Sequence, residues 1–538
     1  SLNGSRPPAI IFVSQYCYRA YISLPYFTYN QQANMSTELQ YREILPQRDV
    51  ADGAFTRGVQ NFLWSVGSPT SFIPSKSYLR FELLVSRSNA AEEQPTLRDL
   101  IAPADNACGN LYNNAAVYAG GQMISQIVTG LPQASALKAR LLSSAAQQES
   151  IGASAMLSEG EFAKRQQMVC SDAQLSSLSD DYELRPLTDV VADQRAATTT
   201  VAIAVTGVVT EGASTALNNA GATPGDTLIA DGQRFQFIAV AAGAGNIRVS
   251  PAPSVAIAAT ANAYIIKQRP RTSQGANRFY VMWKPPLGFF DVAAPMPAGD
   301  YRLALNPSGD YKTAAIESFL GSAAVATAAA NYDFKVKGVS LYLATIKTSV
   351  PRDFIAPLYE VNVQSKPYSN GTLNFTIPSS TKAVSIWVQA DAAGSNPLIP
   401  SSMFKTFANG GTEKPYLNLE SLQLTYANLT KPSTRWSSAY GTGVNQLQQR
   451  YYDTYNEAGM LSGAGGVERF EEYLDRGPVY HFSWERDVED ASTELQVTAN
   501  YANGLPAGSS IFVGAWYSKS ISISSSGGMV REVQSRVA

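Results

Sequence analysis

The architecture is most evident in the stretch from Asn277 to Val292, which reads NRFYVMWKPPLGFFDV. Aromatic and branched residues come first and predict a short strand, because they fit a pleated, half-buried surface. The two prolines inside the stretch end that strand, since proline cannot donate to a sheet ladder. An aromatic pair, Phe289 and Phe290, follows the next glycine, and residues 297–307, PAGDYRLALNP, alternate as a second strand. Short strands separated by proline and glycine predict an all-β protein.

The same alternation occurs on both sides of this stretch. In SYLRFELLVS, residues 77–86, Leu79 and Phe81 fall on one face while Arg80 and Glu82 fall on the other, which is typical of a half-buried strand. Further strands are expected at NFLWSV (61–66), NAAVYAGGQMISQI (114–127), DFKVKGVSLYLATIK (333–347), GPVYHFSW (477–484), STELQVTANY (492–501) and SSIFVGAWYSKSISIS (509–524).

The hydrophobic period becomes helical in a few places. Within residues 132–148, Ala134, Leu137 and Leu141 recur at helical spacing, and Pro132 suits a first helical turn. This spacing predicts a helix that interrupts the first series of strands. Other helical segments are expected near residues 446–459 and 467–475, with a short one in 313–330.

The order of these segments predicts two successive β units of the same plan. A second cycle of strands starts near Val350, so we expect one jelly roll at residues 35–349 and another at 350–527. A jelly roll is an eight-stranded sandwich of two sheets. The apolar, aromatic residues 1–34 are either an arm that packs on a neighbouring subunit or a first strand, and residues 528–538 are a C-terminal tail.

Residues 199–268 differ in composition from their surroundings. They are rich in Ala, Val, Thr and Gly, and turn signals such as Pro224-Gly225-Asp226 separate short strands there. This pattern predicts a small β-barrel or sandwich inserted into a loop of the first jelly roll. The alternative is that the segment continues the host sheet.

Cysteines and net charge bound the class of protein. The 538 residues carry a formal charge of −2, so the chain is not a polycation built to neutralise nucleic acid. Cys17, Cys108 and Cys170 are widely spaced and odd in number. A disulfide framework is therefore not expected, and the three thiols are expected to be buried and inert in a reducing compartment.

Catalytic chemistry has few candidate residues. His481 is the single histidine, and histidine is the usual general base and a common metal ligand near neutral pH. His481 lies in an alternating segment and is expected to be a strand or interface residue. The glycine-rich run 461–470 lacks the Lys-Ser/Thr ending of a phosphate loop. We therefore expect no enzyme activity and no catalytic, cofactor-binding or metal-binding residues.

The longest apolar stretches are too short to span a bilayer. The first residues, SLNGSRPP, do not have the basic and then apolar pattern of a signal peptide. We therefore expect no membrane span and no secretion signal.

Several of these segments, in this order, resemble the major capsid proteins of the double jelly-roll DNA viruses, especially those of virophages and polinton-like viruses. The resemblance is carried by NFLWSV with SYLRFELLVS, NAAVYAGGQMISQI, FYVMWKPPLGFFDV with PAGDYRLALNP, GPVYHFSWERD, STELQVTANY and IFVGAWYSKSI. These segments extend from about residue 61 to residue 521 and are strand patterns, not catalytic motifs. The 199–268 segment is outside the shared pattern.

The resemblance implies a structural protein of the virion. Such proteins form homotrimers whose six jelly rolls make a pseudo-hexagonal capsomer, and the capsomers tile an icosahedral shell around a DNA genome. Partners would be other copies of the chain and a penton or minor capsid protein, without sequence-specific nucleic-acid binding. The 199–268 insertion would project outward as a tower.

Two other hypotheses remain open at the level of sequence. In a secreted β-sandwich carbohydrate-binding protein, Trp387, Trp436 and Trp516 would serve as sugar platforms, although such residues are more often part of a strand core. A carboxylate-dependent hydrolase is the third hypothesis, because sequence does not reveal which carboxylates meet in space. The adjacent pairs Asp180-Asp181 and Glu471-Glu472 are better explained by a solvated surface, since neighbours on a strand point to opposite sides.

Overall fold

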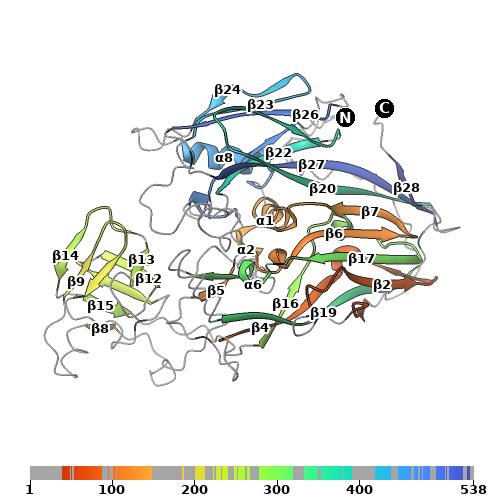
Figure 1. The fold of residues 1–538 in the computed structure, drawn as a ribbon, viewed down its shortest axis with the longest axis horizontal. Coiled ribbons are helices and arrows are strands. Elements are labelled where there is room, and N and C mark those ends of the chain that lie inside the picture. Colours follow the sequence, from red (N-terminus) through yellow and green to blue (C-terminus); the bar gives the residue numbers. More distant parts are fainter. Residues whose placement is uncertain are drawn as a thin grey trace, which may run out of the picture.

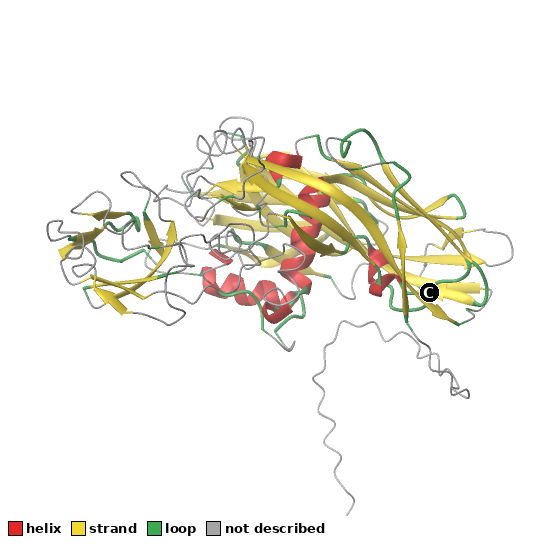
Figure 2. Ribbon diagram, turned by 90° about the horizontal axis from the view of Figure 1, so that it is seen from below, coloured by secondary structure: helices red, strands yellow, loops and turns green. Residues whose placement is uncertain are grey.

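The computed structural model describes the chain between residues 39 and 533 with gaps. The longer gaps are residues 88–94, 96–100, 148–183, 187–199, 212–221, 240–246, 267–277, 319–331, 391–418, 438–445, 485–491 and 525–529, and shorter ones lie between them. Strands dominate what is described, and they form two sandwiches with a smaller unit beside them (Figures 1 and 2).

The first sandwich consists of two antiparallel sheets, each with four main strands. One sheet has the order β1-β19-β4-β16 and the other the order β2-β17-β6-β7. Counted along the chain, these are the first, eighth, third and sixth strands, and the second, seventh, fourth and fifth. This is the strand order of a jelly roll. The strands are β1 (Gln40–Ile44), β2 (Gln60–Val66), β4 (Tyr78–Arg87), β6 (Tyr112–Ala119), β7 (Gln122–Ile127), β16 (Arg278–Trp283), β17 (Gly299–Pro307) and β19 (Tyr332–Lys347).

The second sandwich repeats this order. Its sheets are β20-β27-β22-β25 and β21-β26-β23-β24, which are again the first, eighth, third and sixth strands and the second, seventh, fourth and fifth. The expected double jelly roll is therefore confirmed. The strands are β20 (Asp353–Pro367), β21 (Gly371–Thr376), β22 (Thr381–Ala390), β23 (Leu419–Tyr426), β24 (Leu429–Trp436), β25 (Tyr480–Ser483), β26 (Glu494–Tyr501) and β27 (Ser509–Ser524).

Alternation along the strands explains which face each sheet buries. On β4, Leu79, Phe81 and Leu83 are fully buried in the sandwich, whereas Arg80 and Glu82 point to the other face. On β27, Val513 and Ala515 lie in the core of the second sandwich. The intervening Gly514 therefore lies on the outward face of its sheet.

Short elements supplement the two rolls. β3 (Thr70–Phe72) pairs with β19, and β5 (Ile101–Pro103) pairs with β18 (Ile316–Ser318). The expected helix in residues 313–330 is thus wrong at β18, where the chain is extended, although α6 (Tyr311–Ala314) forms one turn just before it. β28 (Val530–Val533) pairs with β27, so part of the expected tail adds a strand to the sheet. The 3-10 turns are η1 (Pro74–Lys76), η3 (Gly109–Leu111) and η6 (Gly288–Asp291).

Each roll carries a helix in the same connection, between its fifth and sixth strands. In the first roll this helix is α1 (Leu131–Leu142), which is followed by the single turn α2 (Ala145–Gln147). In the second roll it is α8 (Leu447–Glu457), and a helical turn near Tyr473 follows before β25. The helical spacing read from residues 132–148 and 446–459 thus predicted both helices, and α1 ends at Leu142 because Ser143 is extended.

The connection between β7 and β16 also holds a separate small β unit, which lies at the left of Figure 1. Its sheets are β10-β9-β14 and β13-β12-β11-β15-β8. Its buried apolar cluster draws on residues 201–263 alone. Pairing begins at β8, before the expected start at residue 199. The strands are β8 (Leu184–Pro186), β9 (Val201–Ile203), β10 (Val209–Glu211), β11 (Thr227–Ala230), β12 (Gln233–Ala239), β13 (Arg248–Ser250), β14 (Ile257–Thr260) and β15 (Ala263–Ile266).

Candidate functional site: the junction between the two jelly rolls

The two rolls are joined by a continuous apolar cluster, not by a linker alone. In Figure 1, α1 lies between them. Leu137 of α1 belongs to the same buried cluster as Val361, Trp387 and Trp516 of the second roll. The first roll therefore completes its own core with the outward face of the β20-β27-β22 sheet.

Two glycines allow this close approach. A Cβ atom on Gly514 would lie 2.7 Å from Cδ2 of Leu137, and one on Gly130, just before α1, would lie 2.8 Å from the Val363 side chain. Contacts below 3.0 Å require something to move. Helix α1 thus reaches the sheet only because both sides of the contact lack a side chain there.

A third glycine lies where η6 meets β20. A Cβ atom on Gly288 would lie 2.4 Å from the carbonyl oxygen of Tyr359. This glycine belongs to the Pro-Pro-Leu-Gly-Phe-Phe segment that the sequence singled out, and Phe289 and Phe290 beside it are buried in the shared cluster. The segment therefore ends a strand of the first roll and also packs against β20, the first strand of the second roll.

A buried carboxylate marks the same contact. Glu360 of β20 is fully buried, and its Oε1 accepts a hydrogen bond from the Ser125 hydroxyl of β7 at 2.5 Å. Its Oε2 accepts a long hydrogen bond from the Gly288 amide at 3.4 Å, and Lys519 Nζ lies 3.8 Å from Oε1. Burial raises the pKa of Glu360, and Lys519 and Ser125 offset part of that rise. Both polar donors, Ser125 and Gly288, come from the first roll, so this carboxylate is satisfied only when the rolls are together.

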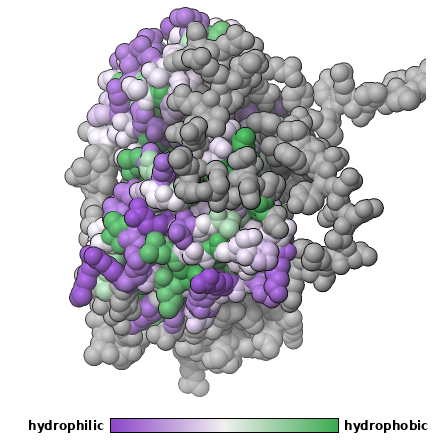
Figure 3. All heavy atoms as spheres, turned by 90° about the vertical axis from the view of Figure 1, so that its right-hand side faces the viewer, coloured by the Kyte–Doolittle hydropathy of each residue, from purple (hydrophilic) through white to green (hydrophobic). Residues whose placement is uncertain are grey.

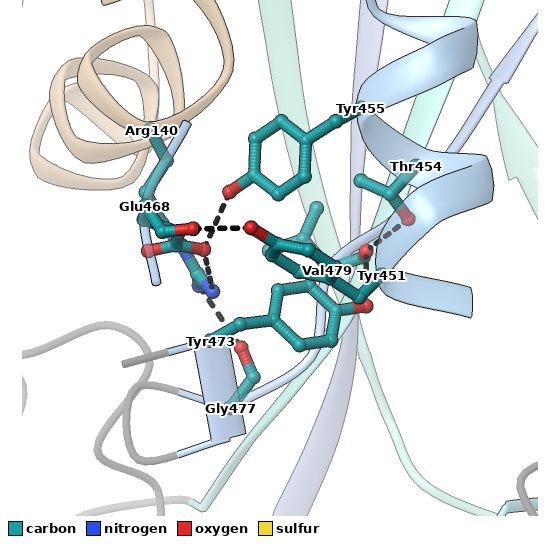
Figure 4. A network of polar contacts seen from close by, with 8 residues as sticks. All are labelled: Arg140, Tyr451, Thr454, Tyr455, Glu468, Tyr473, Gly477 and Val479. Atoms are coloured by element: carbon teal, nitrogen blue, oxygen red, sulfur yellow. Dashed lines mark hydrogen bonds and ion pairs between the residues drawn. The ribbon is translucent and has the colours of Figure 1, made fainter. Parts of the chain in front are cut away.

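A buried ion pair links the two equivalent connections (Figure 4). Arg140 of α1 and Glu468 have only 3% and 1% of their side chains exposed. Nε of Arg140 donates to both carboxylate oxygens, at 2.8 and 3.0 Å, and Nη2 lies 2.6 Å from Oε1. Nη1 donates to the Gly477 carbonyl at 2.9 Å. The Nε–H group thus contacts both carboxylate oxygens, and hydrogen bonds between charged groups are stronger than those between neutral ones.

Three tyrosines surround this pair. Tyr455 donates to Oε1 of Glu468 at 2.5 Å, and Tyr451 donates to the Glu468 carbonyl oxygen at 2.5 Å. The ring of Tyr473 lies under the Arg140 guanidinium, 5.5 Å from its carbon, and the Tyr473 hydroxyl donates to the Val479 carbonyl. Burial raises the pKa of Tyr455 and Tyr473 above the usual tyrosine value. Tyr455 and Tyr473 are therefore neutral donors. Tyr455 holds the carboxylate of Glu468, whereas Tyr451 and Tyr473 hold main-chain carbonyls beside it.

The chemistry of this cluster is that of a structural joint. A general acid or base must reach a substrate proton, but the carboxylate of Glu468 is enclosed by Arg140 and Tyr455 and almost fully buried. Sequence reasoning missed Arg140, Glu468 and Glu360. A signal was present: Arg140 falls three residues after Leu137 on the buried helix face, and Glu360 continues the alternation of Ala356 and Leu358.

His481 lies on β25 between Tyr480 and Phe482, which are in the core of the second roll, so its own side chain points to the outward face of the sheet. It is buried, and its Nδ1 is 2.8 Å from the Ser385 hydroxyl, which also accepts a hydrogen bond from Trp516 Nε1 at 2.8 Å. Burial lowers the pKa of His481 to about 4, although the negative charge of Glu457 opposes that fall. The imidazole is therefore neutral near pH 7 and is held as a buried structural residue against Ser385 of β22 and Trp516 of β27.

The remaining candidates from the sequence are dispersed. Trp387 and Trp516 are buried, and Trp436 is covered by Arg450, whose guanidinium carbon lies 4.6 Å from its ring centre. The suggestion that these three form sugar platforms is therefore wrong, because packing between sheets and helices takes up their faces. Cys108 is buried, and burial raises the pKa of its thiol. Residues 1–34, Cys17, Cys170 and both acidic pairs lie outside the described residues.

Within the described ranges, no three His, Cys, Asp or Glu side chains are grouped to hold a metal ion. None of the described helices is long and apolar enough to cross a bilayer.

The site and the fold together define a class: two jelly rolls of identical strand order fused through a buried joint. No family model and no curated protein matches this sequence. Solved structures that are similar over nearly the whole chain come from virophages and viruses.

One such structure is that of the Sputnik virophage, to a chain of which this protein is 11% identical with a TM-score of 0.45, covering 96% of this chain and 93% of that one. The mavirus major capsid protein is 10% identical with a TM-score of 0.39, covering 98% and 97%. The Faustovirus major capsid protein is 8% identical with a TM-score of 0.45, covering 91% of each chain. The assignment of this chain to the double jelly-roll fold rests on its own strand order.

Replacing Arg140 by Met tests the buried joint. The substitution leaves the Glu468 carboxylate buried without its cation, and we expect the free energy of unfolding to fall by about 3–5 kcal/mol. The double variant Arg140→Met/Glu468→Leu removes both charges and should recover most of that loss. Urea unfolding at one protein concentration measures both. Equal losses in the single and double variants would contradict the pairing.

Replacing Gly288 by Ala tests the close approach of η6 and β20. The added methyl group meets the Tyr359 backbone, which cannot rotate away, so we expect a loss of about 1–3 kcal/mol. Gly309→Ala is the matched control, because a Cβ atom there has nothing within 4 Å. Thermal unfolding of the two variants measures this difference. Equal midpoint temperatures would contradict a close contact between Gly288 and the Tyr359 backbone.

His481 makes stability depend on pH. Its pKa of about 4 in the folded chain is below the ordinary value of 6.5, so the unfolded chain binds the extra proton between these values. The contribution is complete above about pH 6.5 and is lost as the pH falls toward 4. Between pH 7 and pH 4.5 the wild type should lose about 2–3 kcal/mol more stability than His481→Gln. Parallel urea titrations at the two pH values check this, and identical losses would count against it.

Proposed function

We propose that this chain is the major capsid protein of an icosahedral DNA virus and that it assembles as a homotrimer. Three copies supply six jelly rolls, which form a pseudo-hexagonal capsomer, and capsomers tile the shell of the virion. The observation that carries the proposal is the repetition of one strand order in two rolls that share a buried cluster.

The rigid fusion of the rolls favours this role over others of the same fold. Jelly rolls also occur in lectins and cupins, and these bind ligands through single sandwiches. A cupin-type metal site would require several histidines, whereas this chain has one, buried against Ser385 and Trp516. We infer a structural, non-enzymatic role without cofactors.

The surface composition is compatible with extensive self-contact. Hydrophobic residues gather in groups between hydrophilic ones on the face seen in Figure 3. Large apolar side chains such as Leu45, Leu63 and Tyr280 are exposed on the first roll. Exposed apolar groups of this kind mark interaction surfaces. With a formal charge of −2, the chain is better suited to contact other copies and a penton or minor capsid protein than to bind nucleic acid by sequence.

The inserted β unit would project outward from the capsomer. We propose that residues 199–268, with the preceding β8, form a tower at the end of the first roll. The unit has its own core, and insertions in exposed loops cost little closure entropy. The segment also has few basic residues, which disfavours a position facing the genome.

The state of the purified protein tests this proposal. Light scattering after size-exclusion chromatography should give a mass three times that of the 57.7 kDa chain. Electron microscopy should reveal pseudo-hexagonal particles with three protrusions on one side. A monomer at all accessible concentrations, or a trimer that buries less than about 800 Å² in total, would contradict it.

A further inference from the structure

An aromatic surface covers the outward face of the β1-β19-β4-β16 sheet. It is formed by Tyr41, Tyr78, Arg80, Tyr280, Met282 and Tyr342, and we call it the tyrosine face. Strand pairing brings these residues together, because Tyr342 pairs with Tyr78, and Arg80 pairs with Met282. Tyr280 is 57% exposed and Tyr41 49%.

The tyrosine face is held in one arrangement before any partner arrives. The rings of Tyr78 and Tyr342 stack with centres 5.4 Å apart and planes 1° from parallel. The guanidinium of Arg80 lies 4.7 Å from the centre of the Tyr342 ring and 5.1 Å from that of Tyr280. Arg80 also forms an ion pair with Glu43 of β1 at 2.9 Å. Preorganised aromatic and arginine side chains lose little conformational entropy on docking and are enriched in interfaces.

The second roll provides an internal example of what covers this face. Tyr342 lies on the outward side of β19, the eighth strand of its roll, between the buried Leu341 and Leu343. Gly514 lies on the outward side of β27, the eighth strand of the second roll, and α1 of the first roll packs on it. In the second roll, this face is therefore occupied by the helix from the connection between the fifth and sixth strands of the other roll.

The helix of the second roll that corresponds to α1 has a free side. The inner side of helix α8 packs next to β25, and Thr454 there donates to the carbonyl of Val479, the residue just before that strand. Gln448, Tyr452 and Asn456 follow one another at intervals of four residues on the other side, and all three are exposed. Tyr452 is 58% exposed. A tyrosine between two amides is a composition that suits a partly polar interface.

We propose that the tyrosine face binds a second copy of this chain through the exposed side of α8, with Tyr452 packing among the exposed rings of that face. The contact repeats between copies the α1 contact made within the chain. It is heterologous, so it closes into a ring when each copy offers one tyrosine face and one α8. The inference rests on the proposed capsomer and assigns its interface.

Two variants of the full chain test this contact from its two sides. Tyr41→Ser/Tyr280→Ser alters only exposed rings of the tyrosine face, and Tyr452→Ala alters only α8. Each should weaken association by at least about tenfold and give monomers by light scattering. Val255→Ser, at a 74% exposed apolar residue of the inserted unit, is the matched control and should remain trimeric. Circular dichroism and thermal unfolding should give the same fold for every variant.

Mixing the two defective variants distinguishes this contact, between two different surfaces, from a symmetric contact in which one surface binds its own copy. The mixture retains one intact contact, between α8 of the tyrosine-face variant and the tyrosine face of the α8 variant. It should therefore give a one-to-one dimer that does not close into a trimer.

If the folded variants remain trimers like the control, the assigned interface is wrong, but the proposal of a trimeric capsomer is unaffected. If the variants are monomers but their mixture gives no dimer, the pairing of these two surfaces is wrong. A wild-type monomer overturns the capsomer and the interface together.

Discussion

The close approach of α1 to the sheet of the second roll is the contact on which the rest of the structure depends. It requires Gly514 beneath Leu137 and Gly130 beside Val363. It also places Arg140 against the carboxylate of Glu468 and the carbonyl of Gly477. A shift of one helical turn would bury the arginine without its carboxylate, at a cost of several kcal/mol. The apolar contact therefore supplies the attraction, and the ion pair restricts it to one register.

This division of labour follows from the magnitudes involved. Burying an apolar side chain contributes about 1.5–3 kcal/mol, and the shared cluster contains many of them from both rolls. A buried ion pair contributes little net stability against an apolar replacement, because desolvation offsets the attraction. Glu360 acts in the same way, because two of its donors, Ser125 and the Gly288 amide, come from the first roll and meet it only in this arrangement. Charges at the joint thus specify how the rolls meet, while hydrophobic contact keeps them together.

The alternation of apolar and polar residues, and the prolines and glycines between strands, predicted most of the fold. They predicted little of the contact between the two rolls. Segments such as 77–86 and 509–524 reveal their strands because the period of two is a local property. The two helices also follow from local spacing. The partners of Arg140 and Glu360 do not, since Arg140 and Glu468 are 328 residues apart and no local pattern pairs them. The strand at residues 316–318 was not predicted for a related reason. An alanine-rich run favours helix, but pairing with β5 overrides that preference.

The same reasoning explains why the outward faces of the two equivalent sheets differ. The second roll has Gly514 on its eighth strand, since the helix that covers it belongs to the same chain and always lies against it. The first roll has Tyr342 on the outward face of its own eighth strand, where its ring stacks on Tyr78 and lies next to the Arg80 guanidinium. A face exposed until a partner binds must be stable in water beforehand, and tyrosine hydroxyls and a guanidinium meet that requirement better than aliphatic side chains. A permanent contact permits a glycine and a close helix, whereas a contact made on assembly favours rigid, amphipathic rings.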